Sequence, residues 1–278
     1  MTIPARAGAG FRSCHAADVL DNHPDVAWFE IHPENYMVDG GPRLEVLETL
    51  CADYPVSFHG LALSLAGVER PDKDHLKALK RLIDRYQPAL VSEHVAWSAF
   101  AGHYFADLLP FPFCRESLDC LVRNVSEVQD FLGRRILIEN PAQYLALPGH
   151  EMSEVEFITE AAERSGCGIL FDAANLYITQ HNIGSDVKKY VTALAPSLIG
   201  EVHVAGYSRE NFQGKDILID SHSDVVSDQV WEIYEALIER TGPVPTLVEW
   251  DNDIPEWAVL EGEVKKADAI LANRRKAA

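Results

Sequence analysis

The chain has 278 residues, of which 47% are hydrophobic and 24% charged, a globular composition that excludes a disordered or fibrous protein. Its 24 basic and 43 acidic residues give a net charge of −19, which argues against nucleic acid or an anionic membrane surface as a partner. Its apolar runs fall short of the roughly 18 residues of a membrane span, and the first residues predict no secretory signal.

Short apolar runs recur along the chain and are predicted to be β-strands. They cover residues 26–32, 55–60, 89–94, 135–140, 168–173, 198–206, 216–222 and 245–250, of which 216–222 is the weakest. Strands that are almost continuously hydrophobic are typical of a parallel sheet that is buried on both faces.

Segments with helical periodicity lie between these strands. They cover residues 42–54, 73–86, 115–133, 153–166, 186–196, 227–242 and 256–273. In the segment 153–166, Ser153 and Glu156 have the spacing of a capping box, and Gly166 is placed to end the helix.

The alternation of strands and helices predicts a (β/α)8 TIM barrel that occupies residues 1–278 as a single domain. A doubly wound open sheet is the alternative, but it needs a Gly-rich turn after the first strand. The one candidate turn, GAGFRS at residues 8–13, precedes the first predicted strand. Five cysteines without a C-x-x-C pair predict a reduced, cytoplasmic chain without disulfides or a thiolate zinc site.

Every predicted strand ends in His, Asp or Glu, although these three types form under a fifth of the chain. The strand-end residues are Glu30 and His32, His59, Glu93 and His94, Glu139 and Asn140, Asp172, Glu201 and His203, Asp220 and His222, and Glu249. In a TIM barrel the carboxyl ends of the strands meet at one mouth, where the catalytic residues lie.

Titratable groups that converge on a mouth of low dielectric constant need compensation, and divalent cations provide it by direct ligation. Imidazole and carboxylate ligands suit iron, manganese or zinc. Glu139, midway around the barrel, is the natural residue to bridge two ions. Other interpretations stay open for single residues: Asp172 could cap a helix, Glu249 could pair with an arginine, and Glu30 could shape the mouth without touching metal.

Many separated motifs resemble one bacterial family nearly end to end. They include HPENY (32–36), FHGLALSL (58–65), SEHVAWS (92–98), DLLPFPF (107–113), LIENPAQYL (137–145), GCGILFDAANLY (166–177), EVHVAGYS (201–208), IDSHSDVV (219–226) and VEWDNDIP (248–255). The family is that of the multinuclear non-haem iron-dependent oxidative enzymes, formerly domain of unknown function 692, which includes the methanobactin-biosynthesis oxidase.

The resemblance implies a barrel of the xylose-isomerase-like type with two or three irons, as Fe2+ or Fe3+, at its mouth. By this likeness His59 and His94 bind one iron with Glu139 bridging; Asp172, His203 and Glu249 complete a second; and Asn175, Asp220 and His222 hold a third, more labile ion. Glu139 and His203 are then the residues whose loss should abolish catalysis. Two positions depart from the family pattern: Asn175 stands where some members have histidine, and Tyr207 replaces the last histidine of an H-x-A-G-H string.

The resemblance further implies an iron-dependent oxidoreductase that uses O2 to modify cysteines of a ribosomally made precursor peptide, which a small partner protein presents. Two alternatives remain on the residues alone. One is a zinc- or manganese-dependent hydrolase or isomerase, phosphodiesterase-like, on the same barrel, and the other is a non-catalytic metal-binding module. Residues 108–113 could dock a partner or plug the barrel as a buried loop.

Overall fold

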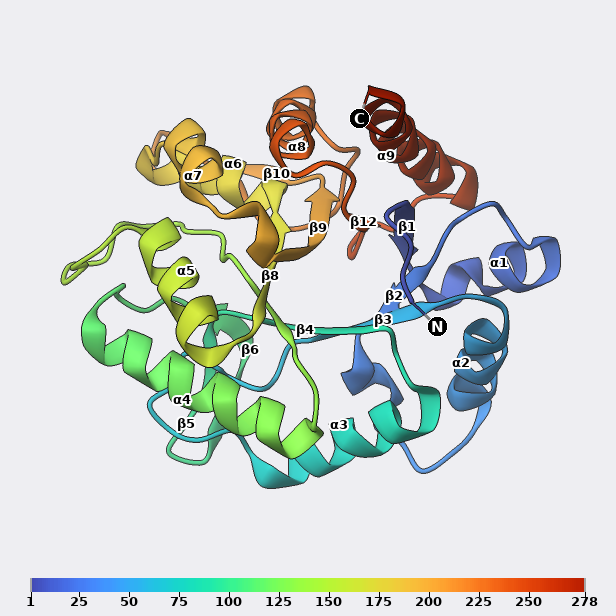
Figure 1. Ribbon diagram of the computed structural model, residues 1–278, viewed down its shortest axis with the longest axis horizontal. Coiled ribbons are helices and arrows are strands. Elements are labelled where there is room, and N and C mark those ends of the chain that lie inside the picture. The colour runs from blue at the N-terminus through green and yellow to red at the C-terminus, as the bar shows by residue number, and fades with distance from the viewer. Residues whose placement is uncertain (1, 278) are drawn as a thin grey trace.

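A computed structural model describes residues 2–277, and its centre is a closed barrel of parallel strands (Figure 1). Around the barrel the strand order is β1-β12-β9-β8-β7-β4-β3-β2. In chain order these strands are β1 (Ala7–Gly10), β2 (Phe29–Ile31), β3 (Val56–Gly60), β4 (Leu90–His94), β7 (Leu137–Glu139), β8 (Gly168–Asp172), β9 (Ile199–Ala205) and β12 (Thr246–Glu249). The TIM barrel predicted from the sequence is confirmed.

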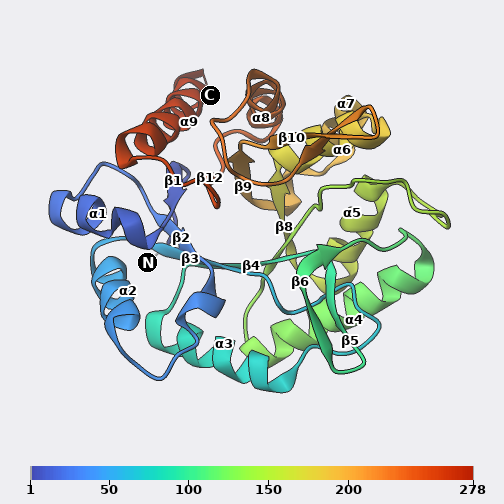
Figure 2. The same cartoon turned by 180° about the vertical axis from the view of Figure 1, so that it is seen from behind.

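Helices surround the strands, as the two opposite views show (Figures 1 and 2). They are α1 (Ala16–Asn22), α2 (Pro42–Asp53), α3 (Lys73–Tyr86), α4 (Arg115–Leu132), α5 (Glu154–Ser165), α6 (Ala173–Ile183), α7 (Val187–Ala193), α8 (Asp228–Thr241) and α9 (Trp257–Ala277). Short 3-10 turns are η1 (Ser13–His15), η2 (Pro33–Tyr36) and η3 (Pro196–Leu198). The predicted capping box of α5 is present, because Ser153 accepts from the Glu156 amide and Glu156 accepts from the Ser153 amide.

One predicted barrel strand was wrong. Within 216–222 the chain forms β11 (Lys215–Ile219), which pairs antiparallel with β10 (Ser208–Phe212) in a hairpin outside the barrel. The eighth barrel strand is instead β1, with the sequence AGAG, which gave no strand signal. Gly8 of this strand lies so close to Trp28 that a Cβ atom on it would be 2.5 Å from the Trp28 ring.

A second hairpin, β5 (Trp97–Phe100) and β6 (His103–Leu109), is inserted between β4 and α4. Leu108 and Leu109 at the end of β6 are half-buried, Pro110 is exposed, and Phe111 and Phe113 in the following segment are buried. Burial is therefore observed for the two phenylalanines, whereas the docking of a partner at 108–113 stays a prediction.

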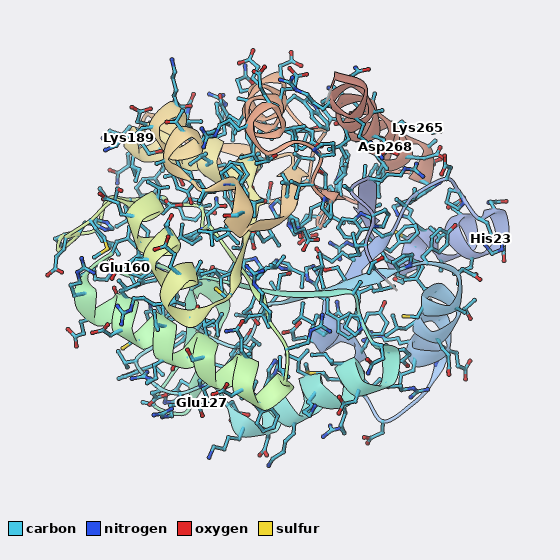
Figure 3. The ribbon with its side chains drawn as sticks, viewed as in Figure 1. His23, Glu127, Glu160, Lys189, Lys265 and Asp268 are labelled. Carbon is cyan, nitrogen blue, oxygen red and sulfur yellow. The ribbon has the colours of Figure 1, made fainter. Side chains whose placement is uncertain are left out.

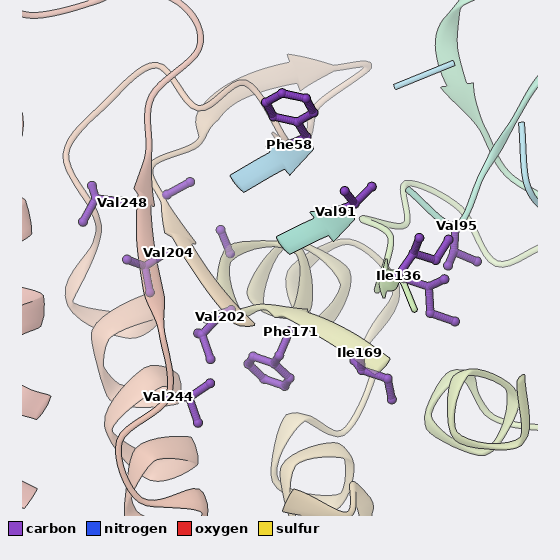
Figure 4. Packing of buried hydrophobic residues seen from close by; sticks show 14 of the residues in the cluster. Phe58, Val91, Val95, Ile136, Ile169, Phe171, Val202, Val204, Val244 and Val248 are labelled. Carbon is purple, nitrogen blue, oxygen red and sulfur yellow. The ribbon is translucent and has the colours of Figure 1, made fainter. Parts of the chain in front are cut away.

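The strands alternate between an outer, apolar face and an inner face that carries polar groups. Outward side chains such as Phe58, Phe171 and Val202 belong to the buried apolar cluster (Figure 4). The residues that alternate with them, such as His59 and Asp172, point into the barrel. The strand register determines both which side chains pack outside the barrel and how far along the barrel axis each inward side chain lies. Packing of the outer layer therefore fixes the positions of the inward side chains.

The outer surface is charged. Glu127 and Glu160 point away from the barrel (Figure 3), and ion pairs cross between helices, as in Arg115–Glu160 at 2.5 Å. Such exposed pairs contribute at most about 1 kcal/mol each. Among residues 2–277, every helix is too short or too polar to cross a membrane.

Candidate metal centre

Strand register brings the candidate ligands to one level at the carboxyl end of the barrel. His94 of β4 is directly opposite Glu139 of β7, and Asp172 of β8 is opposite His203 of β9. Because parallel strands with paired ends present equivalent side chains to the same edge, residues far apart in sequence share one mouth.

The first group consists of His59, His94 and Glu139. Glu139 Oε2 lies 3.1 Å from the Nε2 atoms of both histidines, and these two nitrogens lie 3.3 Å apart. The far side of each ring is already engaged: His94 Nδ1 donates to the Gly60 carbonyl at 3.0 Å, and His59 Nδ1 is hydrogen-bonded to Ser92 Oγ at 2.7 Å. With Nδ1 engaged, Nε2 is the nitrogen that can face a cation.

The second group consists of Asp172, His203 and Glu249, joined by Glu139. His203 Nδ1 lies 2.9 Å from Glu249 Oε2, and one ligand atom each from Glu139, Asp172 and His203 lies within 4.8 Å of the others. The two carboxylate oxygens of Asp172 differ in their contacts. Asp172 is the N-cap of α6, where its Oδ1 atom accepts a hydrogen bond from the Asn175 amide at 2.6 Å, whereas its Oδ2 atom has no hydrogen-bond partner. Glu139 belongs to both groups and is placed to bridge them.

The third group is less compact. His222 Nε2 lies 2.6 Å from Asp220 Oδ1, whereas Asn175 donates from Nδ2 to Glu139 Oε1 at 3.3 Å. Asp220 and His222 were predicted at a strand end, and the structure places them in the loop after β11. His222 holds a left-handed backbone with φ of 46°, uncommon for a non-glycine residue and frequent at functional sites.

Charge is compensated within the site by close pairs of imidazole and carboxylate. Burial opposes the ionisation of Glu139, but the neighbouring His94 and His59 outweigh it and lower the pKa of Glu139 to about 2. Burial opposes the charged form of His59 as well, yet Glu139 raises the pKa of His59 to about 9. The neighbouring histidines stabilise the charged form of Asp172 less than burial and the adjacent Glu139 destabilise it. The pKa of Asp172 is therefore raised well above its usual value.

Buried ligand atoms without a hydrogen-bond partner support a cation at this mouth. Among the described residues, Asp172 Oδ2 and Asn175 Oδ1 have neither a hydrogen bond nor an ion-pair contact. Glu139 Oε2, Asp220 Oδ1, His203 Nε2 and His222 Nε2 have ion-pair contacts but no hydrogen bond of standard geometry. Leaving a buried polar atom unsatisfied costs roughly 1–3 kcal/mol, more if it is charged. Each of these residues is one that the sequence singled out, and their nitrogen and oxygen donors fit a first-row divalent metal.

Sequence reasoning missed a cation beside the site. Arg12, just after β1, pairs with Asp251 and donates from Nε to the Trp250 carbonyl at 2.8 Å. Asp251 Oδ2 in turn lies 3.5 Å from His32 Nε2 and 3.7 Å from His222 Nδ1. A correct assignment of β1 would have placed Arg12 at a strand end and identified it as a candidate site residue.

A cavity of about 120 Å³ adjoins the metal centre. Its lining includes His94, Asn175 and Asp220, together with apolar residues such as Leu109 and Phe111 and the polar Asp107 and Gln143. This cavity gives a small substrate group access to the candidate ligands from an apolar side.

Comparisons with known proteins identify a family and a fold for the chain. The family described as RiPP precursor modification enzyme MbnB/TglH/ChrH matches residues 6–272. A UPF0276 protein of Caulobacter vibrioides is 48% identical over 267 residues, which cover 96% of this chain and 95% of the relative. One from Chromobacterium violaceum is 45% identical and covers 97% and 96% of the two chains.

Solved structures with low sequence identity share the fold. A xylose isomerase-like TIM barrel protein from Mycobacterium smegmatis, in complex with magnesium, has a TM-score of 0.63 at 16% identity and covers 97% of both chains. Endonuclease IV from Thermus thermophilus has a TM-score of 0.61 at 14% identity and covers 96% of this chain and 99% of its own. At these identities the likeness concerns the barrel alone.

Proposed function

Because the chain belongs to the MbnB/TglH/ChrH family of RiPP precursor modification enzymes, we propose that it is a multinuclear iron-dependent oxidase. Its substrate is a ribosomally made precursor peptide, in which it modifies cysteine residues with O2 as the oxidant. A small partner protein presents the peptide. The proposal adds the metal, the oxidant and the target residue to what family membership establishes.

The observation that carries the proposal is the shared position of Glu139. Its Oε2 atom faces two imidazole nitrogens at 3.1 Å, and the same carboxylate belongs to the group formed with Asp172 and His203. A bridging carboxylate between two nitrogen- and oxygen-donor groups suits adjacent metal ions, and it distinguishes the site from a mononuclear one.

Each proposed ion has its own residues. The first ion is held by His59 and His94 together with Glu139. The second ion is held by Asp172, His203 and Glu249. The third ion is held by Asn175, Asp220 and His222. Iron bound in this way supplies the O2 binding and one-electron chemistry that amino-acid side chains lack. The protein positions the ligands, keeps them out of bulk water and admits the substrate.

The cavity next to His94 is partly apolar, which supports a small group such as a cysteine side chain as its occupant. Leu108, Leu109 and Phe111 are among its apolar lining residues, and Asp107, Gln143, Asn175 and Asp220 are among its polar ones. An apolar wall lowers the local dielectric constant and keeps bulk water from a bound thiol. The negative net charge likewise disfavours a nucleic-acid substrate.

The decisive experiment combines metal analysis with peptide modification. The protein is purified without oxygen, and its iron, manganese and zinc are quantified. The genes beside its own are then searched for a short Cys-containing peptide and a small partner protein, and O2 uptake is followed after both are added. We expect bound iron, O2 uptake that depends on the peptide, and a mass change in the peptide.

Three controls sharpen the result. A peptide with Cys→Ser should not be modified, and neither Glu139→Ala nor His203→Ala should turn over substrate. Full turnover by either variant contradicts the proposal. Zinc without iron in the freshly purified protein, with no O2 uptake, favours the hydrolase alternative instead.

A further inference from the structure

Two carboxylates lie inside the barrel below the ligands assigned above. Glu30 of β2 is 3% exposed, and Glu201 of β9 is fully buried. Both oxygens of Glu201 and the Oε2 atom of Glu30 have no hydrogen-bond partner. Inward-facing positions of TIM barrels are usually filled by branched apolar residues, so two acidic side chains here need a reason.

The group they face is the imidazole of His203. Its Nε2 atom lies 3.3 Å from Glu30 Oε1 and 3.8 Å from Glu201 Oε1. The opposite ring nitrogen, Nδ1, lies 2.9 Å from Glu249 Oε2, on the side of the second ligand group. One ring therefore has acidic oxygens on both sides, of which only Glu249 is among the proposed metal ligands.

The two sides of the ring have different uses. A neutral imidazole carries one proton, and the nitrogen without the proton is the one that binds metal. His203 Nε2 makes no hydrogen bond of standard geometry in the structure, and Glu30 Oε1 at 3.3 Å is the nearer of the two carboxylate oxygens that could accept a proton from it. A carboxylate in that place fixes the tautomer of a ligating histidine and orients its ring.

We propose that Glu30 is a positioning residue of the metal centre, which keeps the proton of His203 on Nε2 and thereby presents Nδ1 to the second ion. Glu201 lies 3.8 Å from Nε2, which is beyond hydrogen-bonding distance, so its effect on the His203 ring is secondary to that of Glu30. The inference rests on the proposed metal centre, and it concerns how one ligand is held.

The experiment uses Zn2+ as a diamagnetic probe of the whole chain. Competition with a chelator measures the affinity of each site, and NMR of protein with ¹⁵N-labelled histidine reports which ring nitrogen of His203 holds the proton and which holds zinc. Comparison with His203→Gln assigns the signals. In the wild-type protein we expect a protonated Nε2 and a zinc-bound Nδ1.

Glu30→Ala should weaken one zinc site by roughly 10–100-fold, the range typical for loss of such a partner. The other sites should keep their affinity, and the His203 nitrogen signals should shift. Glu30→Gln preserves the shape and an acceptor oxygen, so we expect a smaller loss at the same site. It also provides the test if Glu30→Ala does not fold.

Ser57→Ala is the matched control. Ser57 pairs with Glu30 across β2 and β3, is fully buried and has an unpartnered Oγ, but it is not among the contacts of His203. It should bind zinc as the wild type does. Wild-type affinity and unchanged His203 signals in both Glu30 variants would overturn the inference, as would zinc bound to His203 Nε2. Failure of the wild-type protein to bind any divalent metal would instead refute the proposed function.

Discussion

His59 and His94 hold their Nε2 atoms 3.3 Å apart inside the mouth of the barrel. Two neutral acceptor nitrogens so close repel each other unless a proton or a cation lies between them and the facing Glu139 oxygen. Each ring is fixed from behind, His94 by the Gly60 carbonyl and His59 by Ser92. The geometry thus depends on residues outside the ligand set, and these are open to test.

The first prediction concerns Ser92, whose Oγ lies 2.7 Å from His59 Nδ1. Ser92→Ala removes the group that orients this ring, so the ion held by His59, His94 and Glu139 should bind roughly 10–100-fold more weakly. Isothermal titration of the metal-free protein with Fe2+ under nitrogen measures this change. Ser98→Ala, which removes an equally buried hydroxyl on β5, should leave the titration unchanged. Equal affinities in the two variants would contradict the assigned role.

The second prediction separates the two functions of Asp172. Its Oδ1 atom caps α6 by accepting from the Asn175 amide, and its Oδ2 atom is free for metal. Asp172→Asn keeps a capping oxygen but lowers the ligand's charge, so the metal-free protein should stay nearly as stable while the second ion is lost. Asp172→Ala should lose that ion and also about 1 kcal/mol of stability. Urea unfolding in chelator and metal analysis measure the two effects, and loss of both properties together in Asp172→Asn would refute the division.

The third prediction concerns pH and lies outside the metal centre. Burial raises the pKa of Glu154 to about 7, although its hydrogen bond from Gln143 Nε2 at 2.5 Å acts in the opposite direction. In the unfolded chain this carboxyl ionises near its ordinary value of 4.5. Between about pH 4.5 and 7 the folded state therefore holds a proton that the unfolded state has released. The free energy of unfolding should fall as the pH rises through this window, by up to about 3 kcal/mol, and then level off.

Glu154→Gln isolates this contribution because the amide does not titrate. Urea unfolding of both proteins in chelator, from pH 5 to pH 8, gives the difference in stability, and other titrating groups cancel in that difference. The wild type should lose stability relative to the variant as the pH rises. A difference that is flat or of opposite sign would show that Glu154 ionises normally in the folded protein.

Much of the barrel was predictable because strand and helix patterns are local. The strand around Phe58 and His59 is one of the short apolar runs, so its existence could be inferred, and the position of His59 near its end placed that residue at the mouth. The strand β1, with the sequence AGAG, and the helix α6 could not be predicted from the sequence. In β1, the close contact of Gly8 with Trp28 leaves no room for a side chain, and glycine gives no strand signal. In α6, the consecutive residues Ala173, Ala174, Asn175 and Leu176 are all buried, so buried side chains surround the helix and there is no single apolar stripe.

The convergence of candidate ligands at the barrel mouth was easier to predict than some of the elements that carry them. His59 and Asp172 follow strands whose ends meet, so their convergence is a consequence of the barrel. Asp220 and His222 reach the same mouth from a hairpin loop, which residue patterns could not distinguish from a strand end. The pairing of Arg12 with Asp251 spans 239 positions and depends on β1 lying beside β12, a relationship that only the closed barrel reveals.

The fourth prediction concerns Asn175, whose Oδ1 atom is buried without a hydrogen-bond partner near Glu139. An amide oxygen is a weaker ligand for a first-row metal than an imidazole nitrogen. Asn175→His should therefore retain the third ion, with Asp220 and His222, through a chelator wash that removes it from the wild type. Elemental analysis before and after the wash measures retention. Asn175→Ala should lose that ion and keep the two bridged by Glu139. If the histidine variant releases metal as readily as the alanine variant, position 175 does not contact the third ion.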